Sequence, residues 1–133
     1  MESTKRLYRF RKEERLCSEK AIAELFKHGK RIRTACLQLI YTVFADTDAP
    51  PIQVLITVPK KQFKSAVLRN RLKRRIREAY RLNKAPLLTA LIRGQKNMQI
   101  ALVYLGNEVL EYREIDESVV QGVISLLDYL ELN

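Results

Sequence analysis

Histidine and cysteine are scarce in this 133-residue chain, which has one histidine and two cysteines. His28, Cys17 and Cys36 do not form a Cys/His cluster with the spacing of a zinc site. We therefore expect no metal site, and we interpret both cysteines as ordinary, partly buried thiols. His28 follows Lys27 at the end of a predicted helix, so we interpret it as part of the helix terminus and not as a catalytic base.

Long apolar runs are also missing. No run reaches transmembrane length, and the polar segment from Met1 to Arg6 is not followed by the apolar stretch of a signal peptide. We therefore expect a cytoplasmic protein with no membrane partner. Apolar residues still make up 47% of the chain, which is enough for a folded core. The sequence predicts a single domain over residues 1–133, with residues 1–14 as a mobile basic arm.

Motifs that would carry catalysis are absent from the sequence. It contains no recognisable nucleophile–base–orienter set and no Gly-x-x-x-x-Gly-Lys-Ser/Thr loop. A group of acidic residues between Glu108 and Glu117 is dense enough to suggest metal ligands. We interpret it instead as compensation for the dipole of the last helix and as a source of solubility. We expect no catalytic residues and no metal ligands in this chain.

Positive charge is what the chain has in excess, and one segment holds all of the excess. Residues 60–84 contain eleven Lys or Arg and a single acid, Glu78, which sums to +10. The whole chain has the same net charge of +10, because the remaining residues include fourteen basic and fourteen acidic ones. Such a concentration of charge favours a polyanion as partner, and nucleic acid is the first candidate.

The hydrophobic pattern predicts six elements in the order α-β-β-α-β-α. They are a helix from Ser18 to about His28 with Gly29 as its C-cap, strands over 37–44 and 52–58, a helix over 66–83, a strand over 98–105, and a helix capped by Asp116 that ends near Leu130. The pattern also allows a short strand near 31–34. The turn over 46–51 predicts an antiparallel hairpin. Together these elements predict an α+β fold, built as a two-layer α/β sandwich.

The helix over 66–83 is predicted to carry its charge on one face. At about 100° per residue, its core-facing stripe consists of Leu68, Leu72, Ile76, Ala79 and Asn83. The opposite face consists of Arg69, Asn70, Lys73, Arg74, Arg77 and Arg81. A solvated helix face normally alternates the sign of its charges, because like charges at i, i+4 repel. This face therefore indicates phosphate binding, for which the planar guanidinium is well suited.

Three lysines, Lys60, Lys61 and Lys64, lie between a strand end and the start of this helix. The N-terminus of a helix offers unpaired backbone N–H groups and the positive end of its dipole. We expect these lysines and the helix start to form an anion site together.

The run from Phe63 to Arg81 resembles the signature of the bacterial ribonuclease P protein subunit. The shared pattern is Ala-Val-x-Arg-Asn-x-x-Lys-Arg-x-x-Arg-Glu, preceded here by Val58-Pro59-Lys60-Lys61. Residues 25–30 are similar to the family's N-terminal helix, and the resemblance covers about residues 10–130. It implies the small α/β sandwich of a ribosomal protein domain, with a left-handed βαβ crossover.

The resemblance also implies a function. Such a protein binds the catalytic RNA of ribonuclease P and assists removal of the 5′ leader from precursor tRNA, while Mg²⁺ is held mainly by the RNA. We expect no obligate protein partner. The implied contacts to the RNA subunit are Lys60, Lys61, Arg69, Asn70, Lys73, Arg74, Arg77 and Arg81. The implied lining of a leader cleft between the first helix and the sheet is Ile22, Phe26, Ile40, Tyr41 and Lys64.

The sequence departs from the family at three positions. The family usually has aromatic residues where this chain has Ile22 and Leu37, and often a serine at Pro59. Stacking on the leader would then use Tyr41 instead, and Pro59 removes one backbone donor beside the phosphate-binding turn.

Three other interpretations are open from the residues alone: another rRNA- or tRNA-binding protein on the same fold, a stand-alone nuclease, and a DNA-binding helix-turn-helix. The Arg-Asn-x-x-Lys-Arg run argues against the first. The lack of a catalytic carboxylate cluster or a histidine pair argues against the second. A strand following the basic helix argues against the third.

Overall fold

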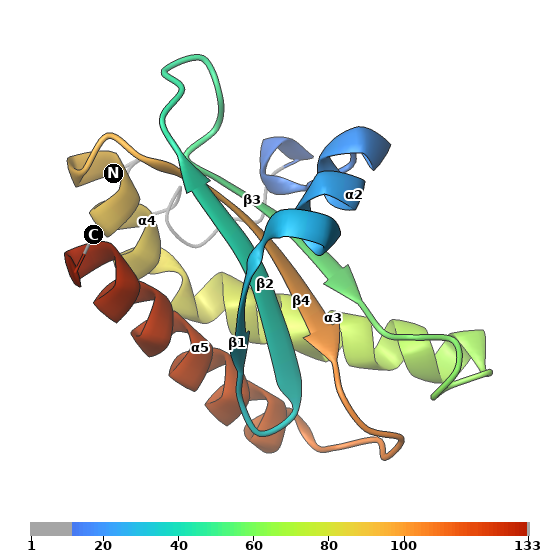
Figure 1. The fold of residues 1–133 in the computed structure, drawn as a ribbon. Coiled ribbons are helices and arrows are strands. Elements are labelled where there is room, and N and C mark those ends of the chain that lie inside the picture. The colour runs from blue at the N-terminus through green and yellow to red at the C-terminus, as the bar shows by residue number, and fades with distance from the viewer. Residues whose placement is uncertain (1–11, 133) are drawn as a thin grey trace.

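A mixed four-stranded sheet forms the centre of the computed structural model, which describes residues 12–132 (Figure 1). The elements are the 3-10 helix η1 (Lys12–Glu14), α2 (Glu19–His28), β1 (Lys30–Arg33), β2 (Leu37–Phe44), β3 (Ile52–Thr57), α3 (Ala66–Asn83), α4 (Ala85–Arg93), β4 (Asn97–Tyr104) and α5 (Tyr112–Leu132). Helices α3, α4 and α5 cover one face of the sheet, and α2 packs on the other (Figure 1). The predicted α+β class is confirmed.

The predicted hairpin between β2 and β3 is wrong. The strand order is β1-β2-β4-β3, so β4 lies between them, antiparallel to β2 and parallel to β3. β4 is buried along most of its length, and such a strand belongs at the centre of a sheet. The segment 45–51 therefore crosses the end of β4. There the buried Asn97 accepts a hydrogen bond from the Asp46 amide (2.9 Å) and donates one to the Pro50 carbonyl (2.9 Å).

The parallel pair β3 and β4 is joined by a long connection through α3 and α4. Parallel neighbours cannot be joined by a tight turn, so the chain must cross a face of the sheet between them. The left-handed course of this crossover stays a prediction. Sequence reasoning missed α4, although Pro86 in its first turn and Gly94 at its C-cap are ordinary boundary signals.

Helix α2 begins and ends as predicted. The Ser18 hydroxyl accepts a hydrogen bond from the Ala21 amide (3.2 Å), and the Gly29 amide donates to the Leu25 carbonyl (2.8 Å). Glycine is required at position 29 by lack of space, since a Cβ there would lie 2.5 Å from the Leu25 carbonyl oxygen and 2.8 Å from Ile40 Cγ2. The end of α2 therefore lies directly on β2.

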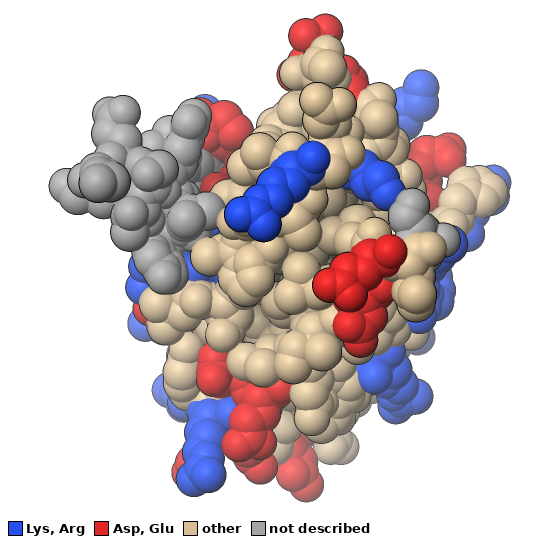
Figure 2. All heavy atoms as spheres, turned by 90° about the vertical axis from the view of Figure 1, so that its left-hand side faces the viewer, with Lys and Arg blue, Asp and Glu red and all other residues tan. Residues whose placement is uncertain are grey.

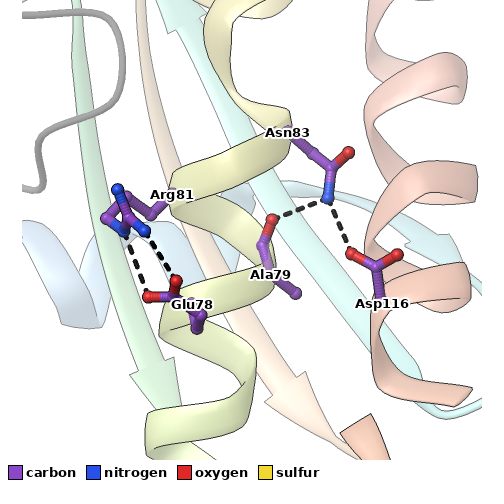
Figure 3. A network of polar contacts seen from close by, with 5 residues as sticks. All are labelled: Glu78, Ala79, Arg81, Asn83 and Asp116. Atoms are coloured by element: carbon purple, nitrogen blue, oxygen red, sulfur yellow. Dashed lines mark hydrogen bonds and ion pairs between the residues drawn. The ribbon is translucent and has the colours of Figure 1, made fainter. Parts of the chain in front are cut away.

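Helix α5 begins at Tyr112, so Asp116 lies inside the helix and is not its cap. Asp116 instead accepts a hydrogen bond from the Asn83 amide group (2.9 Å), which also donates to the Ala79 carbonyl (2.8 Å) (Figure 3). The bond to Asp116 joins the last turn of α3 to the second turn of α5. Asp116, which was predicted to cap its own helix, thus makes a tertiary contact with α3.

A buried ion pair fixes the beginning of the described chain. Lys84, between α3 and α4, is 0% exposed, and its ammonium group donates a hydrogen bond to the Glu14 carboxylate of η1. Leu16 adds a backbone bond from its amide to the Val54 carbonyl (3.0 Å). Most of the predicted basic arm, residues 1–11, lies outside the described residues, whereas residues 12–14 belong to the fold.

We expect Glu14→Ala to lower the free energy of unfolding by about 3–5 kcal/mol, because it leaves the buried Lys84 ammonium without its carboxylate partner. The neighbouring Glu13 is exposed, and Glu13→Ala should change stability by no more than about 0.5 kcal/mol. Urea unfolding followed by circular dichroism measures both. Equal effects of the two substitutions would contradict a stabilising role of the ion pair.

Candidate nucleic-acid interface

The turn between β3 and α3 is held by two side chains of its own helix. The Ser65 hydroxyl caps α3 by accepting a hydrogen bond from the Leu68 amide (3.3 Å). Arg69 Nη1 donates to the carbonyls of Phe63 (2.7 Å) and Lys64 (2.9 Å). The Phe63 ring is buried against Tyr104, with 5.8 Å between ring centroids. The turn therefore has a defined conformation.

Lys60, Lys61 and Lys64 are all exposed on this turn, beside the N-terminus of α3. They are positioned as expected for the predicted anion site. Arg69 was predicted as an RNA contact, but one nitrogen of its guanidinium group is bonded to the carbonyls of the turn. Sequence reasoning assigned Arg69 to RNA alone, and its contact with RNA stays a prediction beside this structural role.

The two faces of α3 agree with the predicted wheel. Leu72, Ile76 and Ala79 are buried, Tyr80 joins them, and Leu68 and Asn83 are half-buried. On the other side Asn70, Arg71, Arg74 and Arg77 are exposed and Lys73 is half-buried. The helix thus presents its basic side chains to solvent while its apolar stripe faces the core.

Besides Arg69, three more basic residues of the segment 60–84 have partners inside the fold. Arg81 binds Glu78 through two hydrogen bonds (2.6 and 3.1 Å), which lower the pKa of the Glu78 carboxyl group (Figure 3). Arg75 donates to the Leu110 carbonyl, and Lys84 pairs with Glu14. Arg81, a predicted RNA contact, therefore has its charge matched locally, and Lys84 does not belong to the exposed surface at all.

The rest of the surface is not uniformly basic. Figure 2 shows the left-hand side of Figure 1, over α4 and the C-terminal part of α5, where tan side chains separate scattered blue and red ones. The first turns of α3 and the lysine-bearing turn lie toward the opposite side of Figure 1. The face shown in Figure 2 therefore carries charges of both signs and no continuous basic patch.

The predicted leader-cleft residues are not all brought together. Ile40 is 1% exposed, because it is covered by Leu25 of α2, and Tyr41 points to the opposite face of the sheet, where its ring meets Tyr129 edge-on (5.2 Å between centroids). Successive strand residues alternate between faces, so Ile40 and Tyr41 could not line one cleft. The prediction for Tyr41 is wrong, and Ile40 lies beneath α2.

What lies beside α2 is a half-buried apolar strip, formed by Ile22 and Phe26 of α2 with Leu55 of β3 and Val103 of β4. We call these four residues the α2 strip. Sequence reasoning missed Leu55 and Val103, although the period of two in β3 and β4 would have placed them on this face. Lys64 is exposed, and its position at the edge of such a cleft stays a prediction.

Groups suited to metal or redox chemistry are scarce in the part of the chain that the structure describes. Within residues 12–132, no three His, Cys, Asp or Glu side chains are grouped to hold a metal ion. Cys17 is exposed, unlike predicted, and Cys36 is buried. Burial raises the pKa of the Cys36 thiol, which lies 3.2 Å from the Ser118 hydroxyl. None of the helices in this range is long and apolar enough to cross a membrane.

Comparison with known proteins gives one consistent result. The family model "Ribonuclease P" matches residues 10–118. The ribonuclease P protein component of Porphyromonas gingivalis is 34% identical over 115 residues, covering 86% of this chain and 84% of that protein. The protein component from Chlorobium phaeobacteroides is 42% identical over 104 residues, covering 72% of this chain and 71% of that protein.

Solved structures share the fold. The RNase P protein of Staphylococcus aureus superposes with a TM-score of 0.65 at 20% identity, covering 86% of this chain and 94% of that chain. The RNase P protein from Thermotoga maritima gives a TM-score of 0.61 at 21% identity, covering 83% and 94%.

The two roles of α3 arginines can be separated by their effect on stability. We expect Arg69→Ala to lower the free energy of unfolding by about 1–3 kcal/mol, because two carbonyls of the turn lose a charged donor. Arg77→Ala, on the exposed face, should change it by no more than about 0.5 kcal/mol. Urea unfolding measures both variants. If Arg69→Ala is as stable as Arg77→Ala, the turn does not depend on Arg69.

Proposed function

This chain belongs to the ribonuclease P protein family, and on that premise we propose that it is the protein component of ribonuclease P, acting in maturation of tRNA 5′ ends. In this proposal it binds the catalytic RNA subunit and precursor tRNA in the cytoplasm, with no obligate protein partner. The main support for the proposal is the exposed basic face of α3. The turn before this helix is held in place by Ser65 and Arg69.

Binding to the RNA subunit would use phosphate contacts. Arg74 and Arg77 are exposed on α3, and Lys60 and Lys61 are exposed on the turn before it. Contacts of cationic side chains with phosphates give affinity and orientation without reading sequence. A rigid helix that displays such side chains suits an RNA whose shape, more than its sequence, is recognised.

The protein would assist cleavage without performing it. The described residues do not fit a protein-held Mg²⁺ site, so we assign no step of the reaction to a metal bound by this chain. Its basic side chains would instead neutralise phosphates where the two RNAs approach each other. This contribution should matter most when divalent cations are scarce.

The precursor's leader would lie along the α2 strip. Phe26 offers a ring, and Ile22, Leu55 and Val103 offer apolar surface beside it. Single strands of variable sequence are held by stacking and charge, because every base has a π-face. Phe26 would provide the aromatic contact with a leader base, because Tyr41 faces α5 on the other side of the sheet.

The direct test is cleavage of precursor tRNA at low Mg²⁺ by the ribonuclease P RNA of the source organism, with and without the protein. We expect the protein to accelerate cleavage at least about tenfold. Its Lys and Arg side chains would neutralise RNA phosphates that otherwise need bound Mg²⁺. The double variant Arg74→Ala/Arg77→Ala should stimulate less, whereas Arg93→Ala, at the exposed end of α4, should act as the wild type.

The other outcomes of this experiment are equally informative. An intact protein that binds RNA tightly but gives no stimulation would point to a different RNA partner on the same fold. Cleavage by the protein alone would contradict a non-catalytic role.

We expect Phe26→Ala to weaken binding of precursor tRNA to the reconstituted holoenzyme about five- to tenfold, because a stacked base loses its aromatic partner. Mature tRNA, which has no leader, should bind within about twofold of its affinity for the wild type. Ile92→Ala removes an exposed apolar side chain of α4, away from the α2 strip, and serves as the control. Equal losses for precursor and mature tRNA would mean that Phe26 acts only by packing α2.

A further inference from the structure

A second group of α3 side chains faces the beginning of α5 and borders a pocket that is open to solvent. Arg71, Arg74, Arg75 and Glu78 of α3 and Tyr112 of α5 line a cavity of about 510 Å³, within the range of small-ligand sites. The α3 residues are spaced i, i+3, i+4 and i+7, so they form one stripe of the helix. We call these five residues the α3–α5 pocket.

The walls of the pocket are fixed by hydrogen bonds around it. Arg75 donates to the Leu110 carbonyl, which ties α3 to the segment before α5. Tyr104 holds the same segment, since its hydroxyl donates to the Glu108 carbonyl (2.8 Å) and accepts from the Leu110 amide (3.2 Å). One turn beyond Tyr112, Asp116 is bonded to Asn83 (2.9 Å) (Figure 3). The separation of α3 and α5 is therefore set on both sides of Tyr112.

The charge of the pocket is positive despite its carboxylate. Both oxygens of Glu78 accept hydrogen bonds from Arg81, so the charge of Glu78 is matched from outside the pocket (Figure 3). Arg71 and Arg74 are exposed, and Arg75 is half-buried with one nitrogen on the Leu110 carbonyl. The net charge of the pocket lining therefore comes from the guanidinium groups of Arg71, Arg74 and Arg75. This positive charge favours binding of an anion.

Tyr112 adds an aromatic surface to this cationic wall. It is half-buried, and it packs against the main core with part of its surface still accessible. Burial, together with the nearby Asp116 carboxylate, raises the pKa of Tyr112, so its phenol is neutral at physiological pH. Guanidinium groups beside an accessible aromatic ring match the two parts of a nucleotide, namely its phosphate and its base.

We propose that the α3–α5 pocket binds one nucleotide of the RNA subunit, with its phosphate on Arg71 and Arg74 and its base against the Tyr112 ring. This inference rests on the proposed function and extends it, because it adds a residue of α5 to an interface predicted from α3 and the turn before it. It also places an RNA contact on the helical face of the sheet, whereas the α2 strip lies on the other face.

The test measures equilibrium binding of the full chain to the ribonuclease P RNA at several salt concentrations. Tyr112→Leu should weaken binding about five- to tenfold, whereas Tyr112→Phe keeps the ring and should bind within about twofold of the wild type. Arg71→Ala should weaken binding and reduce the slope of log K against log salt by about 1. Arg113→Ala, the exposed neighbour of Tyr112 on α5, should leave that slope unchanged.

The outcomes separate this inference from the function on which it rests. If the wild type neither binds the RNA nor stimulates cleavage, the proposed function fails. If it does both and folded Tyr112→Leu binds equally well, the pocket inference fails alone. Equal losses of RNA affinity for Tyr112→Phe and Tyr112→Leu would contradict stacking of a base on the Tyr112 ring. Equal losses of affinity for Arg113→Ala and Arg71→Ala would mean that Arg71 contributes only general surface charge. Because Tyr112 also packs on the core, thermal unfolding of each variant accompanies the binding curves.

Discussion

The parallel pairing of β3 with β4 determines where the charge of this chain lies. Because parallel neighbours need a crossover, the segment between them has to traverse a face of the sheet, and α3 is the main part of that crossover. Leu72, Ile76 and Ala79 are buried under it, so the basic side chains can only face outward. The same crossover places the start of α3 and its lysine-bearing turn at the end of β3, where the helix N-terminus adds to the positive potential.

Charge this concentrated opposes folding, and the structure relieves part of it with internal partners. Arg69 and Arg75 bind backbone carbonyls, Arg81 binds Glu78, and Lys84 is buried with Glu14. The surface available to a polyanion is therefore smaller than the count of eleven basic residues suggests. It is also better defined, since the turn and the pocket walls are set by the same arginines that contribute charge.

The sequence predicted what depends on local periodicity and missed what depends on distant neighbours. The two faces of α3, the caps of α2 and the positions of the strands follow from residue spacing, and the structure has them. The neighbour of β3 could not be predicted from the turn over 46–51, because the burial of β4 decides it. The start of α5 was missed because Asp116 resembles a cap while bonding to α3. The error at Tyr41 was avoidable, since residues 40 and 41 of a strand face opposite sides.

The sheet separates two surfaces of different chemistry. The α2 strip is apolar and lies on one face, whereas α3 and the α3–α5 pocket are cationic and lie on the other. In the proposed function, a leader on the first surface and the RNA subunit on the second would not compete for space. Both partners would be held by one rigid body, so binding of one raises the local concentration of the other. A small protein can assist a reaction between two RNAs in this way, because it fixes their separation and neutralises part of their repulsion.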